Sequence, residues 1–397
     1  MKRNLLIGAS FLVLLLALSV AEVSLEKTAD AQAKGAVMAP RYEVDPFWPK
    51  TLPNKWHIGL TIGVGIDAQD KVWIIHRNNQ LSDSEVGSEG AAAPPVLAFD
   101  PAGNVVQSWG GPDAQNRYQW PESNHGITID HKGNVWIGGN GGPDSHVLKF
   151  TQSGQFISQF GRSGANISAN PQGLGSNDPE NFGRVAKITI DAKANEAYLA
   201  DGYLNKRVAI IDMDTGKMKR FWGAYGNKPS DENMGGYDPD LPLIQQFRSP
   251  VHCADVSNDG LVYVCDRPND RIQVFTKEGK FVSEKRIAPR TRGDGSTWDI
   301  AFSKDAEQKY MFVADGKNER IYVMDRKSME ILTTFGDGGR QPGQFFAVHS
   351  IAIDSKGNLY TTETYEGRRV QKFVYKGLAP VTKMDQGTVW PTTTKKQ

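Results

Sequence analysis

Three of the seven histidines in this 397-residue chain occupy equivalent places in a repeated pattern. The repeated unit is a short apolar run that ends in Asp or Ser. Five residues before that end, the second, fourth and sixth copies carry a histidine. The three residues are His125, His252 and His349. For a single histidine, a hydrogen-bonded turn residue is the simpler interpretation, but three in one register indicate a shared chemical task.

Three neutral imidazoles with a vacant fourth position are typical of a catalytic zinc site, where the metal polarises or deprotonates a bound oxygen. A structural zinc site would normally have a fourth protein ligand, and the sequence offers no candidate. We therefore predict that zinc is bound by the three histidines. The remaining histidines share no register and are predicted to be surface or turn residues; they are His57, His76, His131 and His146.

The elements that must position these side chains are β-strands. Six copies of the repeat begin 46 to 66 residues apart, and their first runs end at Asp67, Asp130, Asp191, Ser257, Ser303 and Asp354. Each copy continues through a turn into a second run with an aromatic residue, then a third run and usually a fourth. Alternating runs joined by such turns are typical of antiparallel strands, and four strands per repeat indicate a propeller blade. We predict an all-β fold, a six-bladed β-propeller with four antiparallel strands per blade.

The sixth copy has only three strands before the chain runs out near Tyr375. Residues Arg41–Asp45 read as the missing outer strand, so an N-terminal strand is predicted to close the last blade. The expected organisation is a signal peptide at 1–31, a linker at 32–40, the propeller at 41–384 and a flexible tail at 385–397.

The N-terminal residues resemble a secretory signal. Lys2 and Arg3 precede an apolar run from Leu5 to Val20, which is shorter than the roughly 20 residues of a spanning helix. Ala29-Asp30-Ala31 offers a cleavage site, and an uncleaved anchor is the alternative. We expect the protein to be exported, to the periplasm or the outside of the cell, without integral membrane association beyond this segment.

Composition excludes several classes of protein. With 46 basic and 45 acidic residues the net charge is +1, so the basic excess of a dedicated nucleic-acid binder is missing. Apolar residues make up 39% of the chain, which excludes a disordered acidic chain. The 41 glycines and 21 prolines favour tight turns over long helices, and two cysteines cannot form a disulfide framework. A monomeric globular protein is expected.

Propeller geometry gives the histidine register its meaning. First strands line the central channel, and alternate blades of six lie roughly 120° apart, so the three imidazoles should converge on the axis. Second strands run back to the same face, which places the residues after them near the metal: Arg77, Tyr203 and Arg267. Two guanidiniums suit a substrate carboxylate, and a phenol beside a metal can act as a base. Arginines paired with blade-edge Asp and a tyrosine that merely packs remain the alternative.

Several segments carry a family resemblance. Gly65-Ile66-Asp67 with Ile75-His76-Arg77, Asn124-His125-Gly126-Ile127, the run from Ala200 to Arg207, Val251-His252, Asp266-Arg267 and Val348-His349-Ser350-Ile351 resemble, in this order, peptidyl-α-hydroxyglycine α-amidating lyase. This family has a six-bladed propeller of the NHL-repeat type. Gln341-Pro342-Gly343-Gln344-Phe345 is also similar to the NHL inter-blade linker. The resemblance extends from about Tyr42 to Tyr375.

The resemblance implies a zinc-dependent lyase. Zinc would be held by the three histidines, Tyr203 would act as the base, and Arg77 and Arg267 would bind the substrate carboxylate and the developing charge. The reaction cleaves the N–C bond of a C-terminal α-hydroxyglycine and yields a peptide amide and glyoxylate. The implied partner is thus a peptide or a small carboxylate-bearing substrate.

The chain also departs from the family pattern. The family binds a structural calcium through backbone carbonyls and an aspartate directly after the third zinc histidine, and this chain has Ser350 there. Calcium would therefore be absent, weaker or differently held, with Val64 and Ile127 as remaining candidates through their carbonyls. The family's cysteine beside the tyrosine is absent. Cys253 and Cys265 lie opposite each other across a turn, where either a cross-strand disulfide or a free pair fits.

Two other functions fit the same sequence. One is a metal-dependent propeller hydrolase or lactonase, although such sites usually rest on carboxylates, Asn and calcium. The other is an NHL-repeat binding propeller without catalysis, which would need no tightly bound metal. The chain carries no hydroxylase half, so the resemblance leaves the physiological substrate open.

Overall fold

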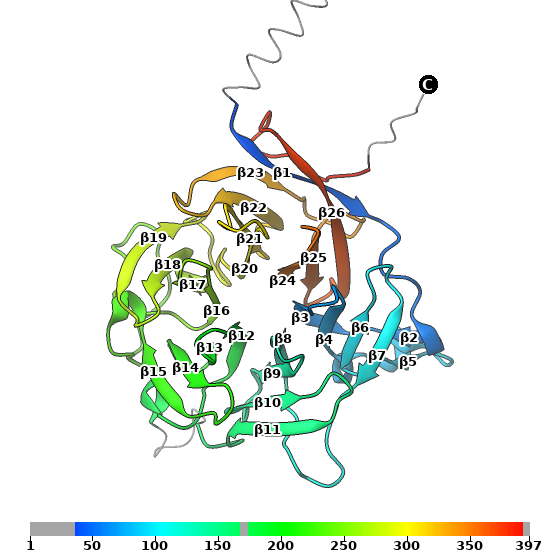
Figure 1. The fold of residues 1–397 in the computed structure, drawn as a ribbon, viewed down its shortest axis with the longest axis horizontal. Helices are drawn as coiled ribbons and strands as arrows, with labels where there is room; N and C mark the ends of the chain where they lie inside the picture. Colours follow the sequence, from blue (N-terminus) through cyan, green and yellow to red (C-terminus); the bar gives the residue numbers. More distant parts are fainter. Residues whose placement is uncertain (1–35, 167–173, 392–397) are drawn as a thin grey trace, which may run out of the picture.

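The six repeats form six four-stranded antiparallel sheets around a central axis in the computed structural model (Figure 1), which describes residues 36–166 and 174–391. The predicted six-bladed propeller is confirmed. From the axis outward, blade one consists of β3 (Leu60–Ile66), β4 (Val72–Arg77), β6 (Val96–Phe99) and β7 (Val105–Trp109), and blade two of β8 (Asn124–Ile129), β9 (Val135–Gly139), β10 (His146–Phe150) and β11 (Phe156–Gly161). Blade three consists of β12 (Val185–Asp191), β13 (Glu196–Asp201), β14 (Arg207–Asp212) and β15 (Met218–Trp222), and blade four of β16 (Val251–Val256), β17 (Leu261–Asp266), β18 (Arg271–Thr276) and β19 (Phe281–Arg286). Blade five consists of β20 (Asp299–Phe302), β21 (Tyr310–Asp315), β22 (Arg320–Asp325) and β23 (Ile331–Phe335), and blade six of β24 (Val348–Ile353), β25 (Leu359–Glu363), β26 (Arg369–Pro380) and β1 (Met38–Asp45).

Blade six is closed by the N-terminal strand, as predicted. Strand β1 runs antiparallel to β26, and the ladder extends from Met38 opposite Pro380 to Asp45 opposite Lys372 (Figure 1). The strand begins three residues earlier than the sequence suggested, so 38–40 belong to the propeller rather than to a linker. The reason is that β26 is long enough to pair with them.

The predicted flexible tail is wrong for residues 385–391. Asp385 forms a β-bridge with Thr334, and the Val44 N–H donates to the carbonyl of Val389, which is itself buried. These contacts fasten the segment over blades five and six. Residues 392–397 and the predicted signal peptide lie outside the described residues. Within the described ranges, no helix has the length and apolar character that crossing a membrane requires.

The remaining elements are short. Most of them decorate blade one, where the insertion 79–95 folds back on the chain before β3. They are the parallel pair β2 (Trp56–His57) and β5 (Ala91–Ala92), the helix α2 (Asp83–Val86) and the 3₁₀ turns η1 (Pro53–Lys55), η2 (Asn78–Gln80), η3 (Gly175–Asn177), η4 (Ala224–Gly226) and η5 (Arg267–Asn269).

The repeated aspartate sets the register of the inner hairpin. Asp67 accepts hydrogen bonds from the backbone N–H groups of the turn that follows, and its other oxygen accepts from Trp73 Nε1 at 3.0 Å. Asp130 makes the same bond to Trp136 at 2.9 Å. One carboxylate thus caps the turn and satisfies the buried aromatic of the second strand, which fixes how the two inner strands pair.

The apolar core lies between the blades. Among the described residues it divides into six clusters, each shared by two neighbouring blades, with Trp73 and Trp136 among the fully buried side chains. Since no cluster spans the axis, the channel is free to hold polar groups.

Candidate metal centre and active site

The three histidines of the register converge on the axis. His125, His252 and His349 lie near the starts of β8, β16 and β24, and each is 2–3% exposed. Their ring centroids are 4.8 to 5.2 Å apart, and one nitrogen from each lies within 4.8 Å of the other two. The structure therefore brings together the residues that the sequence selected as ligands.

Backbone carbonyls of the intervening blades orient the imidazoles. His125 Nδ1 donates to the Ala186 carbonyl at 2.7 Å, and His349 Nδ1 donates to the Ile62 carbonyl at 2.6 Å. His252 Nδ1 donates in the same way to Trp298. Because a carbonyl can only accept, each Nδ1 carries the proton and each Nε2 keeps its lone pair, the arrangement that metal-binding histidines require.

Electrostatics keep these imidazoles neutral. Burial lowers the pKa of His349 to about 3, and the positive charge of Arg267 adds to the effect. Burial likewise holds the pKa of His125 and of His252 well below 6.5, with repulsion from the neighbouring histidine and arginine side chains acting in the same direction. Three neutral, buried nitrogen donors within 4.8 Å of one another fit zinc.

Tyr203 and Arg267 face this histidine group. The Tyr203 hydroxyl lies 3.0 Å from Nε2 of both His125 and His252, and Arg267 Nη1 donates to that hydroxyl at 3.3 Å. The Arg267 guanidinium stacks 4.5 Å from the Trp298 ring. Its Nε is buried and bonds to nothing in the described part of the chain, so a donor remains available for an anion.

Buried ion pairs hold the two loops that carry these residues. Arg207 Nε donates to Asp201 at 2.8 Å and Arg271 Nε donates to Asp266 at 2.7 Å, and all four side chains are fully buried. An asparagine in each loop donates to the same carboxylate. The loop of Tyr203 also packs closely on β16: a Cβ at Gly202 would lie 2.0 Å from the Val251 carbonyl oxygen, so only glycine fits there.

Arg77 approaches from the opposite side of the ring. It ends β4 of blade one, and blade two holds it through the Asn140 side chain at 2.7 Å and the Asn124 carbonyl at 3.3 Å. Burial lowers the pKa of Arg77. Among the described residues it forms no ion pair, whereas Arg267 lies 3.7 Å from Asp294. The alternative in which blade-edge Asp neutralises both arginines therefore does not hold for Arg77.

Sequence reasoning missed further residues around the site. Trp298 occupies the histidine register in blade five and contacts both the His349 ring and Arg267. Tyr365 follows the second strand of blade six and touches Trp298 edge-on. The rule that selected residues after second strands, applied to every blade, would also have selected Tyr365 and Asn140.

Two of the histidines set aside are buried, so the prediction of surface or turn positions is wrong for them. His76 Nδ1 accepts from the Gly59 N–H at 3.1 Å and its Nε2 donates to the Pro94 carbonyl at 2.9 Å. Burial lowers the pKa of His76 to about 4. His146 is buried against Gln119. These hydrogen bonds tie loops to strands, and the periodicity of the sequence does not reveal such contacts.

A cavity of about 490 Å³ lies between the segment before β16 and the loop after β17. It is lined in part by Tyr237, Ser249 and Pro268, and it is shaped by the long segment between blades three and four. Pro268 directly follows Arg267, and Ser249 Oγ donates to the Tyr203 carbonyl at 2.8 Å. This cavity offers room for a substrate beside the two loops.

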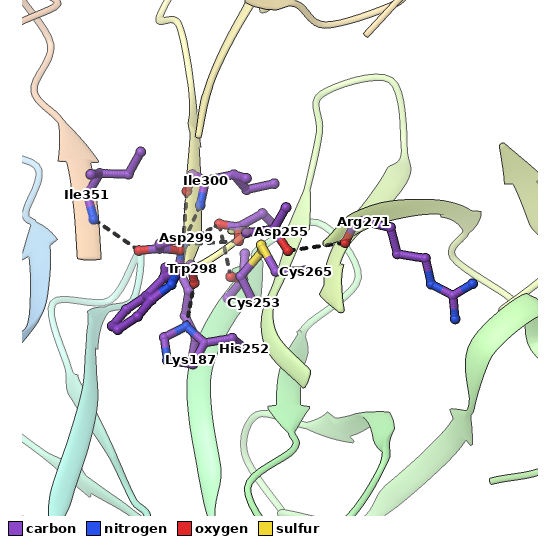
Figure 2. The surroundings of a disulfide bond; sticks show 12 residues. Lys187, His252, Cys253, Asp255, Cys265, Arg271, Trp298, Asp299, Ile300 and Ile351 are labelled. Carbon is purple, nitrogen blue, oxygen red and sulfur yellow. Dashed lines mark hydrogen bonds and ion pairs between the residues drawn. A yellow bond between two sulfur atoms is a disulfide. The ribbon is translucent and has the colours of Figure 1, made fainter. Parts of the chain in front are cut away.

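A second polar group lies in the channel beside the histidines. Lys187 Nζ is 2.6 Å from Asp299 and 2.9 Å from Asp255 (Figure 2). Ser350 Oγ donates to Asp299 at 2.7 Å. Val64 and Ile127, the candidates for calcium, line the same cavity of about 10 Å³ as Lys187 and the histidines. Because an ammonium group lies between the acidic ligands, this donor set does not fit calcium.

The two cysteines are joined. Cys253 on β16 and Cys265 on β17 form a cross-strand disulfide that lies next to Asp255 (Figure 2). The structure therefore contains the disulfide, which is one of the two states that the sequence left open. Disulfides are typical of proteins outside the reducing cytosol, which indicates a non-cytoplasmic location.

Comparison with curated proteins finds distant relatives of this chain. The chain is 26% identical over 344 residues to peptidyl-glycine alpha-amidating monooxygenase B of Xenopus laevis, covering 81% of this chain and 34% of that protein. It is 23% identical to NHL repeat-containing protein 3 of Mus musculus, covering 84% of each. A probable peptidyl-alpha-hydroxyglycine alpha-amidating lyase of Caenorhabditis elegans is 22% identical over 62% of each chain. The chain thus spans about a third of the length of the amidating monooxygenase.

Solved structures agree on the fold. A streptogramin B lyase superimposes with a TM-score of 0.50 at 14% identity, covering 85% of this chain and 98% of its own. A Bacteroides thetaiotaomicron protein of unknown function gives 0.51 at 12% identity, covering 85% of this chain and 76% of its own. No family model matches the chain. The protein is therefore a six-bladed β-propeller whose distant homologues include amidating monooxygenases, NHL repeat-containing protein 3 and a probable amidating lyase.

Proposed function

We propose that the protein is an exported zinc-dependent lyase that cleaves the N–C bond of a C-terminal α-hydroxyglycine, or of a closely related carboxylate-bearing compound. The observation that carries the proposal is the meeting of three oriented, neutral imidazoles with the Tyr203 hydroxyl, 3.0 Å from two of them. The similarity to amidating enzymes over most of the chain supports it. The disulfide supports export, and the protein would act as a monomer.

His125, His252 and His349 would hold the zinc, which supplies a Lewis acid for a substrate hydroxyl oxygen. Tyr203 takes the proton of that hydroxyl, the C–O bond becomes a carbonyl as the C–N bond breaks, and the proton passes to the departing amide nitrogen. The products are an amide and an aldehyde acid, and no water or oxidant is consumed. Electrons and atoms balance within the substrate itself.

The arginines would bind and orient the carboxylate. Arg267 presents a buried, unshared Nε, and Arg77 forms no ion pair among the described residues. Both guanidiniums can form charge-assisted hydrogen bonds to a carboxylate and hold the reacting carbon beside Tyr203. A peptide preceding the hydroxyglycine would extend into the cavity beside Pro268.

Metal analysis together with a glyoxylate-release assay on a hydroxyglycine-ended peptide tests the proposal. One zinc per chain with glyoxylate and amide formed in equal amounts is the expected result. Zinc without glyoxylate would retain the metal site and reject the lyase.

The second candidate is a binding propeller without catalysis. It is favoured by the similarity to NHL repeat-containing protein 3, which extends over 84% of both chains. It predicts no tightly bound zinc and no effect of the Tyr203→Phe substitution on any turnover. A metal-dependent hydrolase or lactonase would instead release an acid when it is incubated with an ester or a lactone.

A further inference from the structure

We propose that the ammonium group of Lys187 is a built-in cation that takes the place of a bound divalent metal ion in the channel and makes this part of the propeller independent of calcium. The inference rests on the contacts of Lys187 and does not depend on the proposed lyase activity.

The surroundings of Lys187 form an oxygen cage. Nζ lies 2.6 Å from Asp299 Oδ1 and 2.9 Å from Asp255 Oδ1, and it donates to the Ile300 carbonyl at 3.1 Å (Figure 2). Carboxylates and a backbone carbonyl are the donors that calcium prefers in proteins. Here an amine with three N–H groups has three acceptors, so its hydrogen-bonding capacity is filled.

The cage joins four blades. Lys187 belongs to β12, Asp255 to β16 and Asp299 to β20, and the second oxygen of Asp299 accepts from Ser350 Oγ at 2.7 Å and from the Ile351 N–H at 3.0 Å on β24. Asp299 is 2% exposed, and it lines the same small cavity as Lys187 and the three histidines. A cation at this point therefore links blades three to six.

Charge explains why a cation is required. Asp255 and Asp299 face one another in a buried setting, and without Lys187 the two carboxylates would repel. Burial raises the pKa of Asp255 to about 6 even though Lys187 opposes that shift. Burial alone would lower the pKa of Lys187, but the two carboxylates outweigh it and the net pKa is raised. Lys187 is therefore a charged ammonium at neutral pH.

The disulfide of Cys253 and the small size of the adjoining cavity both argue against a metal ion beside Lys187. Cys253 lies with Asp255 and Asp299 in a group of metal-binding residue types, but its sulfur is bonded to Cys265 and cannot act as a thiolate. The adjoining cavity is about 10 Å³, the size of about one water position, so a metal ion and the ammonium cannot both be accommodated.

The Lys187→Ala substitution tests the proposal, because it removes the internal cation and leaves both carboxylates. Zinc-loaded protein is melted at mildly alkaline pH, with and without millimolar calcium, and calcium binding is followed by equilibrium dialysis. We expect the wild type to bind no calcium at this site and to keep its melting temperature. The variant should melt roughly 5–10 °C lower and regain most of that loss with calcium.

Lys149→Ala is the matched control. Lys149 is a buried lysine, and within residues 36–166 and 174–391 the single carboxylate that it pairs with is Asp130, at 3.8 Å. Its removal should lower stability without creating a calcium response. If Lys187→Ala does not fold, the double variant Lys187→Ala/Asp255→Asn should restore folding, since it removes the repulsion.

Two outcomes would overturn the proposal. One is a wild type that binds one calcium per chain beside the zinc and is stabilised by it. The other is a Lys187→Ala protein, or a double variant, that behaves like Lys149→Ala, with neither a calcium response nor rescue by neutralising Asp255.

Discussion

The channel holds two polar groups that differ in whether they contain a cation of their own. In the histidine group, three neutral imidazoles from blades two, four and six present lone pairs and no cation of their own. In the lysine group, two carboxylates from blades four and five enclose an ammonium from blade three. The first group could hold an added ion, whereas the second already contains its cation.

The difference shows that the same inner strands can build either kind of site. What decides is the neighbouring residue: Ala186 supplies a carbonyl to His125, and Lys187, next along β12, reaches the carboxylates. We therefore expect substitutions in the histidine group to change metal content and activity, and substitutions in the lysine group to change stability. The predictions below, from the largest expected effect to the smallest, test that separation.

Replacing His252 by Ala should abolish metal binding. With one of three ligands lost, zinc content should fall from one per chain to background, and glyoxylate release should fall with it. The fold should persist because the apolar clusters lie between blades rather than on the axis. Metal analysis and near-ultraviolet circular dichroism check both parts. Global unfolding would show that the histidine group is structural and would remove the contrast.

Tyr203→Phe should lower the rate of glyoxylate release by about 10²–10⁴-fold, since it removes the proton acceptor. Zinc content should stay unchanged, which separates this variant from His252→Ala. Tyr118→Phe serves as the control, because its hydroxyl donates to the Gly111 carbonyl at 3.2 Å in the loop between β7 and β8. A Tyr203→Phe enzyme with the wild-type rate would assign the base to another group.

Asp266→Asn should destabilise the protein by about 3–5 kcal/mol, because the buried Arg271 loses its fully buried carboxylate and keeps only the more exposed Glu284, at 3.3 Å. Urea unfolding measures the change. Asp240→Asn, at the exposed pair with Arg290, should have little effect. If the two variants proved equally mild, the anchors of the site loops would be weaker than their burial indicates.

Acid should act on the histidine group and the lysine group in opposite directions. In metal-free protein the pKa of His349 is about 3, below the ordinary 6.5, so the unfolded chain takes up a proton that the folded chain refuses. Stability is then lost as the pH falls from 6.5, by up to about 1.4 kcal/mol per pH unit. His349→Gln should flatten this slope in thermal melts. The lysine group opposes this trend below about pH 6, since burial raises the pKa of Asp255 to about 6 and the folded chain binds that proton more readily than the unfolded chain.

Ser350→Ala should cost only about 1 kcal/mol, the value of a single hydrogen bond. Asp299 keeps the Ile351 N–H and Lys187 as partners. The variant should remain insensitive to calcium, as measured by thermal melts with and without the ion. A calcium response from this change alone would mean that Ser350, rather than Lys187, excludes the metal.

Much of the fold and part of the site could be predicted because the repeat sets the register. Once the six strand ends were aligned, His125 and its counterparts could be placed on one axis, and the closing strand followed from a missing fourth run. The same alignment contained Trp298 and the carbonyl positions Ile62 and Ala186, but apolar residues in register attract no chemical interpretation.

The lysine group could not be predicted, because its partners come from different blades. Lys187 meets Asp255 and Asp299 only after three blades have packed, and no local spacing connects them. His76 illustrates the same limit, since its partner, the Pro94 carbonyl, lies across a long insertion. The Asp–Arg anchors of the site loops did leave a signal: Asp201 with Arg207 and Asp266 with Arg271 recur at nearly the same spacing.

The closing strand β1 has a consequence for how the molecule folds. Its partner β26 lies more than three hundred residues away in the chain, so the ring can close only after the C-terminal blade has been synthesised. Such remote pairing costs loop entropy and slows folding. A chain truncated before β26 would still contain His349, but it would leave an unpaired edge on β25 and no partner for β1, so closure of the ring around the histidine group would wait for the C-terminal blade.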